Sequence, residues 1–291
     1  MATETAKKFN DAYFTSMDDA KWCIEKLDAL YDLDGKIALE PAAGSGVFLR
    51  ASKKSGLNWV TNELYPEFAR GYDADYSIDF GKDDLTELGR FDFVITNPPF
   101  GNASMLARKF VKRALEVSDV VAMLLPRSCR RGSTIDRDIP DDVKIVLDED
   151  LPGGTFDLPD GTTRDVGCVF IVYERIPGYS RGKLCEYSPG GYRAEPMEFR
   201  KKIHKVEDFW PDWATHGVCV WGSAGKVFDR SRPVPFSSSV LLQLTDQQAN
   251  VVKNIDWTEE VRRTCTTTPR ITYPVVITII NQALRKTAKT K

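Results

Sequence analysis

Phe91-Asp92-Phe93-Val94-Ile95-Thr96-Asn97-Pro98-Pro99-Phe100-Gly101 is the stretch from which the fold can be inferred. Its apolar first half predicts a buried strand, and the paired prolines end that strand because each fixes φ and lacks a backbone donor. The chain therefore leaves a sheet at a strand's C-terminal end, where open α/β sheets bind ligands. The Asn97 amide and the Phe100 ring suit a planar group that carries an amine. The alternative is a plain turn followed by a core aromatic residue.

A glycine loop lies upstream. Residues 36–39 predict a short strand, Glu40 follows it, and a helix is expected from Val47. Between them Ala42, Gly44 and Gly46 let the backbone turn sharply and approach a ligand at the helix N-terminus. No third glycine completes a dinucleotide fingerprint, so the loop alone is equally typical of an ordinary tight turn.

An acidic residue completes the pattern. Glu63 ends a second expected strand, 19 residues after Gly44. In doubly wound sheets an acid at about this spacing binds a ribose diol, although a lone Glu is usually a solvated loop residue. The glycine loop, Glu63 and the Asn97–Phe100 segment each follow a candidate strand, and together they favour an enzyme that uses a nucleoside cofactor.

These motifs carry a resemblance to a known family. From about residue 11 to residue 175, the sequence resembles the S-adenosylmethionine-dependent adenine-N6 methyltransferases, whose catalytic motif is (Asp/Asn/Ser)-Pro-Pro-(Tyr/Phe/Trp). Residues 11–15 are similar to the family's N-terminal cofactor motif, and the nearest type is an orphan DNA adenine methyltransferase of phages or viruses. The resemblance implies no metal, the catalytic residues Asn97, Pro98, Pro99 and Phe100, and the S-adenosyl-L-methionine-binding residues Phe14, Thr15, Glu40, Ala42, Gly44, Gly46, Glu63, Asp79, Phe80 and Asn97.

The resemblance also implies a mechanism. The exocyclic amine of adenine is a poor nucleophile because its lone pair is conjugated into the ring. The side-chain oxygen of Asn97 and the carbonyl of Pro98 would accept its two hydrogens and favour a tetrahedral nitrogen. Phe100 would stack on the base, which must first be flipped out of a duplex.

Three alternatives stay open. An RNA adenine methyltransferase uses the same motif, and a protein-glutamine methyltransferase uses a similar one that generally ends in Tyr. A non-catalytic adaptor with this fold is also conceivable, although such adaptors typically lose the cofactor loop or the acceptor amide.

The low net charge indicates that any contact with nucleic acid is confined to a local basic patch. The net charge of the 291 residues is −2, so any phosphate-binding surface must be a patch. The best candidate is Arg127, Arg130 and Arg131, directly after the apolar run 120–125; a solvated charged loop is the alternative. Further basic clusters are Lys201, Lys202 and Lys205, and the tail 285–291. DNA is the favoured partner over RNA.

Composition bears on the expected location of the protein and on metal binding. No apolar run is long enough to span a membrane, and the N-terminus lacks a signal-like segment, which leads us to expect an intracellular protein. The six cysteines are scattered without a Cys-x-x-Cys pair, and with two histidines a structural zinc site is not expected.

The expected architecture is an α/β fold of the class I methyltransferase type. It has a Rossmann-like, seven-stranded, mostly parallel sheet with an antiparallel last strand, followed by a smaller β-rich appendage. We expect a methyltransferase domain over 1–178 and a C-terminal extension over 179–291 that is a candidate for target recognition. The expected strands are 36–39, 58–62, 91–96, 120–125, 144–147 and 167–173, the helices are 18–30, 46–54, 66–72 and 103–117, and 151–165 is expected to form a hairpin or rim loop.

Overall fold

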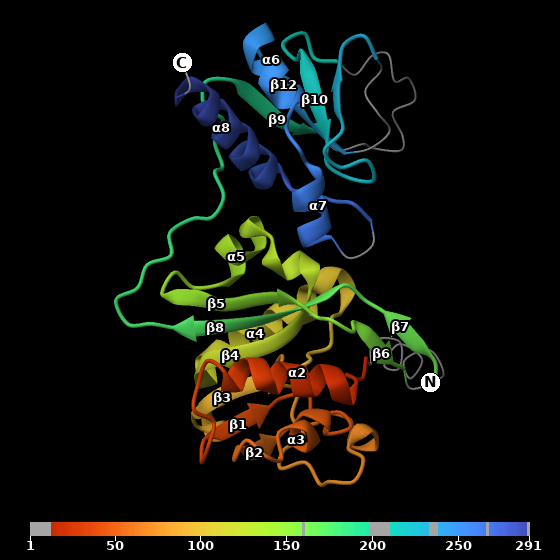
Figure 1. Ribbon diagram of the computed structural model, residues 1–291, viewed down its shortest axis with the longest axis vertical. Coiled ribbons are helices and arrows are strands. Elements are labelled where there is room, and N and C mark those ends of the chain that lie inside the picture. The colour runs from red at the N-terminus through yellow and green to blue at the C-terminus, as the bar shows by residue number, and fades with distance from the viewer. Residues whose placement is uncertain (1–12, 159–160, 198–209, 233–237, 266–267, 290–291) are drawn as a thin grey trace. The chain divides into compact units, whose positions relative to one another are not determined.

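The computed structural model describes residues 13–158, 161–197, 210–232, 238–265 and 268–289 (Figure 1). The predicted lysine cluster at 201, 202 and 205 lies outside these ranges, as do residues 11 and 12 and the last two residues. The described chain divides into two compact units. The first contains residues up to 129 and 138–182, and the second contains 130–137 and the chain from 183 onward.

The first unit is built on a six-stranded sheet of order β2-β1-β3-β4-β8-β5 (Figure 1). Strands β1 to β4 pair in parallel, and β8 runs antiparallel between β4 and β5. The strands are β1 (Ile37–Glu40), β2 (Asn58–Thr61), β3 (Phe91–Thr96), β4 (Ser118–Pro126), β5 (Val143–Asp150) and β8 (Cys168–Arg175). The expected α/β fold with one antiparallel strand is therefore confirmed.

The sheet has six strands among the described residues where seven were expected. The missing position corresponds to the edge beyond β2. There the chain makes only an isolated parallel bridge between Asn62 and Tyr76. The helix predicted over 66–72 is also wrong: the segment forms one 3-10 turn, Pro66–Phe68, and then extends. Gly71 follows at φ +82°, a left-handed conformation that ends any helix there.

Helices cover both faces of this sheet. They are α2 (Met17–Asp28), α3 (Val47–Ala51) and α4 (Met105–Val117), with 3-10 turns at Thr86–Leu88, Asn102–Ser104 and Arg127–Arg130. Ser16 caps α2 by accepting the Asp19 N–H at 3.1 Å, and two aspartates in the first turn complement the helix dipole. The crossovers through α3 and α4 leave β1 and β3 in opposite directions along the sheet. Right-handed connections therefore place these two helices on opposite faces.

The core of the first unit is densest around β8. Five consecutive residues, 169–173, are at most 1% exposed, which agrees with the apolar run that predicted a strand covered on both faces. The chain between β5 and β8 forms the predicted hairpin, with β6 (Thr155–Asp157) antiparallel to β7 (Thr163–Asp165).

The second unit combines a four-stranded antiparallel sheet, of order β11-β10-β12-β9, with helices (Figure 1). Its strands are β9 (Arg193–Met197), β10 (His216–Cys219), β11 (Val227–Asp229) and β12 (Ser239–Gln243), and its helices are α5 (Gly132–Asp138), α6 (Asp246–Lys253), α7 (Thr258–Thr264) and α8 (Tyr273–Lys289). The β-rich appendage is confirmed, and three C-terminal helices accompany it. Alternate residues of β10 and β12 pack against α6 and α8 to form its core.

One buried carboxylate explains why residues 130–137 group with the second unit. Asp136 is 8% exposed and accepts the backbone N–H groups of Leu184 and Cys185 at 2.8 and 2.9 Å. The division into a methyltransferase domain over 1–178 and a C-terminal extension over 179–291 stays a prediction.

Candidate active site

The sequence-predicted motifs meet along one edge of the first unit's sheet. Strands β1, β2 and β3 are parallel neighbours, so the loops that follow Glu40, Thr61 and Thr96 leave the same edge. The connection from β1 goes to β2 on one side, and the chain then returns across β1 to β3. The glycine loop and Asn97 therefore flank the topological switch point, the usual ligand site of such sheets.

Two glycines of the loop adopt backbone conformations that residues with a side chain rarely adopt. Gly44 and Gly46 have φ of +51° and +71°. A β-carbon at position 46 would lie 3.1 Å from the Tyr72 ring, whose hydroxyl donates to the Gly44 carbonyl at 3.0 Å. Only glycine meets both the backbone and the space requirement here.

Glu63 lies against this loop. One carboxylate oxygen accepts the Gly44 N–H at 2.8 Å, and the other accepts the Tyr65 N–H at 2.9 Å. Burial raises the pKa of Glu63, and these two hydrogen bonds oppose the rise. The carboxylate thus joins the glycine loop to the end of β2. Its predicted role in binding a ribose stays a prediction.

Glu40 is a buried carboxyl group with an unmet hydrogen bond. The residue is 2% exposed, and its Oε2 has no partner among the described residues. Burial, followed by the nearby Glu63 carboxylate, raises the pKa of Glu40 well above its usual value, and Arg50 opposes the rise. A cation brought beside this oxygen would reverse much of that penalty.

Asn62 ties the site together, and the sequence analysis missed it. This residue is 1% exposed. Its side-chain nitrogen donates to the carbonyls of Pro41 and Ile78 at 3.0 and 3.1 Å, and its oxygen accepts the Ile78 N–H at 2.9 Å. A polar residue directly after a buried strand was the one available signal.

Asn97 is held by one end of its amide only. The nitrogen donates to the Tyr13 carbonyl at 2.9 Å and to the Thr15 hydroxyl at 3.0 Å. These bonds orient the amide, and they leave Oδ1 buried without a donor among the described residues. A buried acceptor with no partner costs about 1–3 kcal/mol, so this oxygen suits a ligand that brings an N–H group.

Three aromatic rings surround the same segment. Tyr13 stacks on Phe100, with ring centroids 5.4 Å apart and planes 20° apart, and Phe156 of β6 meets both rings edge-on. Phe14 pairs with Asp157 through two backbone hydrogen bonds, so the N-terminal segment and the β6–β7 hairpin are joined here. Sequence reasoning missed Phe156, because nothing local links residue 156 to residue 100.

The other predicted cofactor residues occupy different settings. Phe14 packs edge-on against Phe68 and borders the glycine loop, since a β-carbon at Gly44 would lie 3.3 Å from its ring. Asp79 accepts the Gly81 N–H and pairs with Lys82 at 2.6 Å. Phe80 is 1% exposed and packs against Phe110 of α4, so its ring belongs to the core.

The three arginines proposed to bind phosphate are all engaged. Arg130 is 5% exposed, and its guanidinium donates to the Arg263 carbonyl at 3.3 Å. Arg131 donates to the Thr264 carbonyl at 3.0 Å. Arg127 pairs with Asp150 at 3.1 Å and keeps 30% of its side chain exposed. The structure thus gives Arg130 and Arg131 packing roles that the sequence did not indicate, and phosphate binding by the three stays a prediction.

Backbone strain follows the Asn97–Phe100 segment. Ala103 and Ser104 have φ of +50° and +59°, values uncommon for residues with a side chain, and α4 begins only at Met105. The Ser104 hydroxyl lies 2.8 Å from that of Ser128 and thereby links the loops after β3 and β4. Such strain, of order 1–3 kcal/mol per residue, concentrates at functional sites.

The described residues contain neither a metal-binding cluster nor a membrane-spanning helix. No three His, Cys, Asp or Glu side chains in those ranges are grouped so that they could hold a metal ion. Within the same ranges, no helix has the length and apolar character needed to cross a membrane.

Comparison with known proteins gives structural likenesses only. No protein-family model and no curated protein matches the sequence. A candidate RNA methyltransferase from Pyrococcus horikoshii is 19% identical, with a TM-score of 0.46 over 57% of this chain and 88% of that one. A type I restriction-modification methyltransferase subunit from Streptococcus thermophilus is also 19% identical, with a TM-score of 0.44 over 57% and 45%. Magnesium protoporphyrin IX methyltransferase from Synechocystis, solved with bound SAM, is 12% identical, with a TM-score of 0.42 over 55% and 79%. At this level of similarity, none of the three indicates what this chain binds or modifies.

Proposed function

We propose that this chain transfers a methyl group from S-adenosyl-L-methionine to the exocyclic N6 amine of adenine in DNA. The observation that carries the proposal is the Oδ1 atom of Asn97, a buried acceptor that is held in place but has no donor among the described residues. An adenine amine has an N–H to donate to it. A merely structural asparagine at a turn would be expected to have both ends of its amide satisfied.

The residues around the glycine loop fit the proposed cofactor. Glu40 offers a buried oxygen that has no partner in the part of the chain that the structure describes and that suits the ammonium group of S-adenosylmethionine. Gly44 and Gly46 keep side chains out of the loop, and Glu63 and Asn62 hold it in place. Phe14, Thr15, Ala42, Asp79 and Phe80 complete the proposed set. When bound, the cofactor supplies an electrophilic methyl group.

Asn97, Pro98 and Phe100 would act on the target base. The Asn97 oxygen and the Pro98 carbonyl accept the two amine hydrogens, which raises the electron density available at nitrogen and stabilises the positive charge that develops there. Asn97 is too weak a base to remove a proton, so the proton leaves after transfer. Pro99 keeps the segment stiff and extended.

Phe100 and Phe156 would hold the flipped base by stacking and edge contact. In this structure Tyr13 lies on the Phe100 ring at stacking distance. A base that reaches Phe100 must therefore displace the Tyr13 ring. The hydrogen bond from Arg164 to the Tyr13 hydroxyl, 3.0 Å long, would break in that movement.

DNA is proposed as the substrate from the resemblance of the Asn97–Phe100 motif and its order in the chain to DNA adenine methyltransferases. Residues 179–291 are the proposed target-recognition region, and an intracellular location is part of the same proposal. RNA is the competing substrate, and Arg127, Arg130 and Arg131 would contact phosphates in either case.

The test is methyl transfer from labelled S-adenosylmethionine to separate pools of DNA, RNA and protein. The DNA product is then digested to nucleosides. Label in N6-methyl-2′-deoxyadenosine from DNA is expected. Label in N6-methyladenosine from RNA alone would replace DNA by RNA in the proposal. Label only in protein, or in no pool, would overturn it. Asn97→Ala protein serves as the background control.

A further inference from the structure

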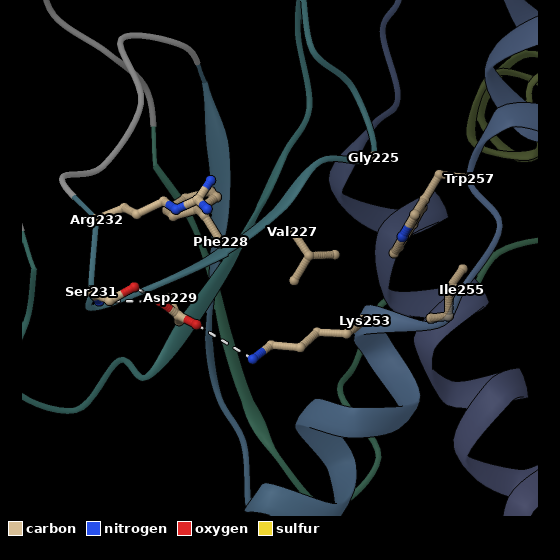
Figure 2. Close-up of a pocket in the computed structure, with 9 residues that line it drawn as sticks. All are labelled: Gly225, Val227, Phe228, Asp229, Ser231, Arg232, Lys253, Ile255 and Trp257. Carbon is tan, nitrogen blue, oxygen red and sulfur yellow. Dashed lines mark hydrogen bonds and ion pairs between the residues drawn. The ribbon is translucent and has the colours of Figure 1, made fainter.

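The second unit contains a pocket of about 350 Å³, within the range of small-ligand sites. Figure 2 shows the nine residues that line it. They come from the β10–β11 turn, β11 and the residues just after it on one side, and from the end of α6 and the chain before α7 on the other. The lining residues are Gly225, Val227, Phe228, Asp229, Ser231, Arg232, Lys253, Ile255 and Trp257.

One end of this pocket is apolar and carries an unmet donor. Trp257 is 6% exposed, and its indole N–H has no acceptor among the described residues. In Figure 2 the nitrogen lies on the ring edge that faces Val227, across the pocket. Gly225 is required beside it, because a β-carbon there would overlap the Trp257 side chain. A buried indole N–H normally finds a partner, so this one points to a ligand acceptor.

The other end is charged. Lys253 pairs with Asp229 at 3.3 Å, and Ser231 donates to the same carboxylate. Hydrogen bonds from Ser231 lower the pKa of Asp229 to about 2, so this group stays ionised. The guanidinium of Arg232 makes no ion pair with any residue in the described ranges. Two cations and one anion leave the lining with one net positive charge, which matches a single phosphodiester.

We propose that this pocket binds one nucleotide, with its base between Val227, Ile255 and Trp257 and its phosphate at Arg232 and Lys253. The indole N–H would donate to an acceptor on the base edge. A nucleotide within a strand and a free nucleoside monophosphate share this chemistry. The inference that the nucleotide belongs to the substrate strand rests on the proposed function.

The test measures binding of two probes to the full chain without cofactor. The first is a fluorescein-labelled single-stranded DNA oligonucleotide, followed by fluorescence anisotropy at several salt concentrations. The second is adenosine 5′-monophosphate, followed by calorimetry with ribose 5-phosphate as the comparison. Saturable binding of the monophosphate but not of the sugar phosphate would identify a free nucleotide as the ligand. Binding of the oligonucleotide alone would identify a strand.

The two ends of the pocket predict different signatures. Arg232→Gln removes one phosphate contact. The negative slope of log K for oligonucleotide binding against log salt concentration should therefore become less steep by about 0.7. Trp257→Phe keeps a ring but removes the N–H, and should weaken binding by about fivefold at every salt concentration. Arg262→Gln removes an exposed cation that does not line the pocket and should bind as the wild type does.

The proposal is overturned if Arg232→Gln and Trp257→Phe bind both probes as the wild type does, or if Arg262→Gln weakens binding equally. Because Trp257 is buried, its variant is first checked for an unchanged thermal unfolding midpoint; Arg232 is exposed, so its variant tests the proposal in any case. Methyl transfer is measured separately. If the protein methylates DNA but the pocket variants bind both probes as the wild type does, only the proposed nucleotide pocket is refuted. If the pocket variants weaken binding but no methyl transfer is detected, only the methyltransferase proposal is refuted.

Discussion

Asn97→Ala is expected to remove activity while leaving stability nearly unchanged. The substitution deletes two hydrogen bonds, to the Tyr13 carbonyl and the Thr15 hydroxyl, worth about 1 kcal/mol each. It also deletes Oδ1, which is buried without a partner within the described ranges at a cost of about 1–3 kcal/mol. The two effects oppose each other, so the free energy of unfolding should change by less than about 1 kcal/mol.

Asn62→Ala is the matched control. Asn62 is also a buried asparagine of the site, but its side chain makes three hydrogen bonds and has no orphaned atom. At about 1 kcal/mol each, their loss should lower the free energy of unfolding by about 3 kcal/mol. The same substitution is thus expected to destabilise the protein clearly at position 62 and to leave its stability nearly unchanged at position 97.

Urea denaturation gives both stabilities, and transfer of labelled methyl groups gives the rates. For Asn97→Ala the rate should fall by at least about 100-fold, which corresponds to roughly 2.7 kcal/mol of lost transition-state stabilisation. Affinity of the variant for S-adenosylmethionine should stay within about threefold of the wild-type affinity. Such a change corresponds to about half the free energy of one hydrogen bond. If Asn97→Ala loses as much stability as Asn62→Ala does, the inference that the buried Asn97 Oδ1 destabilises the protein is refuted. Activity within tenfold of the wild type would refute the catalytic role of Asn97.

Four further predictions follow from the same contacts. Gly46→Ala should lower cofactor affinity and cost about 1–2 kcal/mol in urea denaturation, because its β-carbon meets the Tyr72 ring at φ +71°; an unchanged affinity would contradict the role of the loop. The raised pKa of Glu40 means that the folded state holds a proton which the unfolded state releases, so stability without ligand should fall as pH rises from about 4.5 through that pKa. Affinity for the cationic cofactor should rise over the same window, and Glu40→Gln should flatten both profiles; parallel curves for variant and wild type would argue against Glu40. Tyr13→Ala should lower the KM for the nucleic acid by up to about tenfold, the worth of the ring pair it removes, and a raised KM would show that Tyr13 helps to hold the base. Ala103→Gly should stabilise the protein by about 1 kcal/mol by relieving φ +50°, as thermal unfolding would show.

The sequence predicted most of the first unit's sheet because each strand carries a local signal. The apolar run before Asn97 is β3 with the predicted bounds, and the run 167–173 is the covered antiparallel strand. Where local signals conflicted, prediction failed. Residues 66–72 have helix-compatible spacing but contain Pro66 and Gly71, and the pairing of Tyr76 with Asn62 favours an extended return.

The second unit was less legible because its helices are short or follow turn-rich segments. A capping box at Thr245 and Gln248 marks the start of α6, and the apolar spacing of 275–280 marks the buried face of α8. These two signals were present in the sequence and went unused. Its β-rich character was predicted, and β10 and β11 do pair in antiparallel fashion.

The sequence by itself determined which residues stand at the ends of the parallel strands, because strand, turn and glycine signals are local. It thereby placed the glycine loop, Glu63 and Asn97 at one sheet edge. Only the tertiary structure decided which of their polar atoms have hydrogen-bond partners. Asn97 meets residues 82 and 84 positions away, and Arg130 and Arg131 meet carbonyls 133 positions away. Contacts over such separations depend on packing, which no local pattern encodes. Packing buries Arg130, gives Arg131 a backbone partner, and leaves the Asn97 Oδ1 without a partner among the described residues.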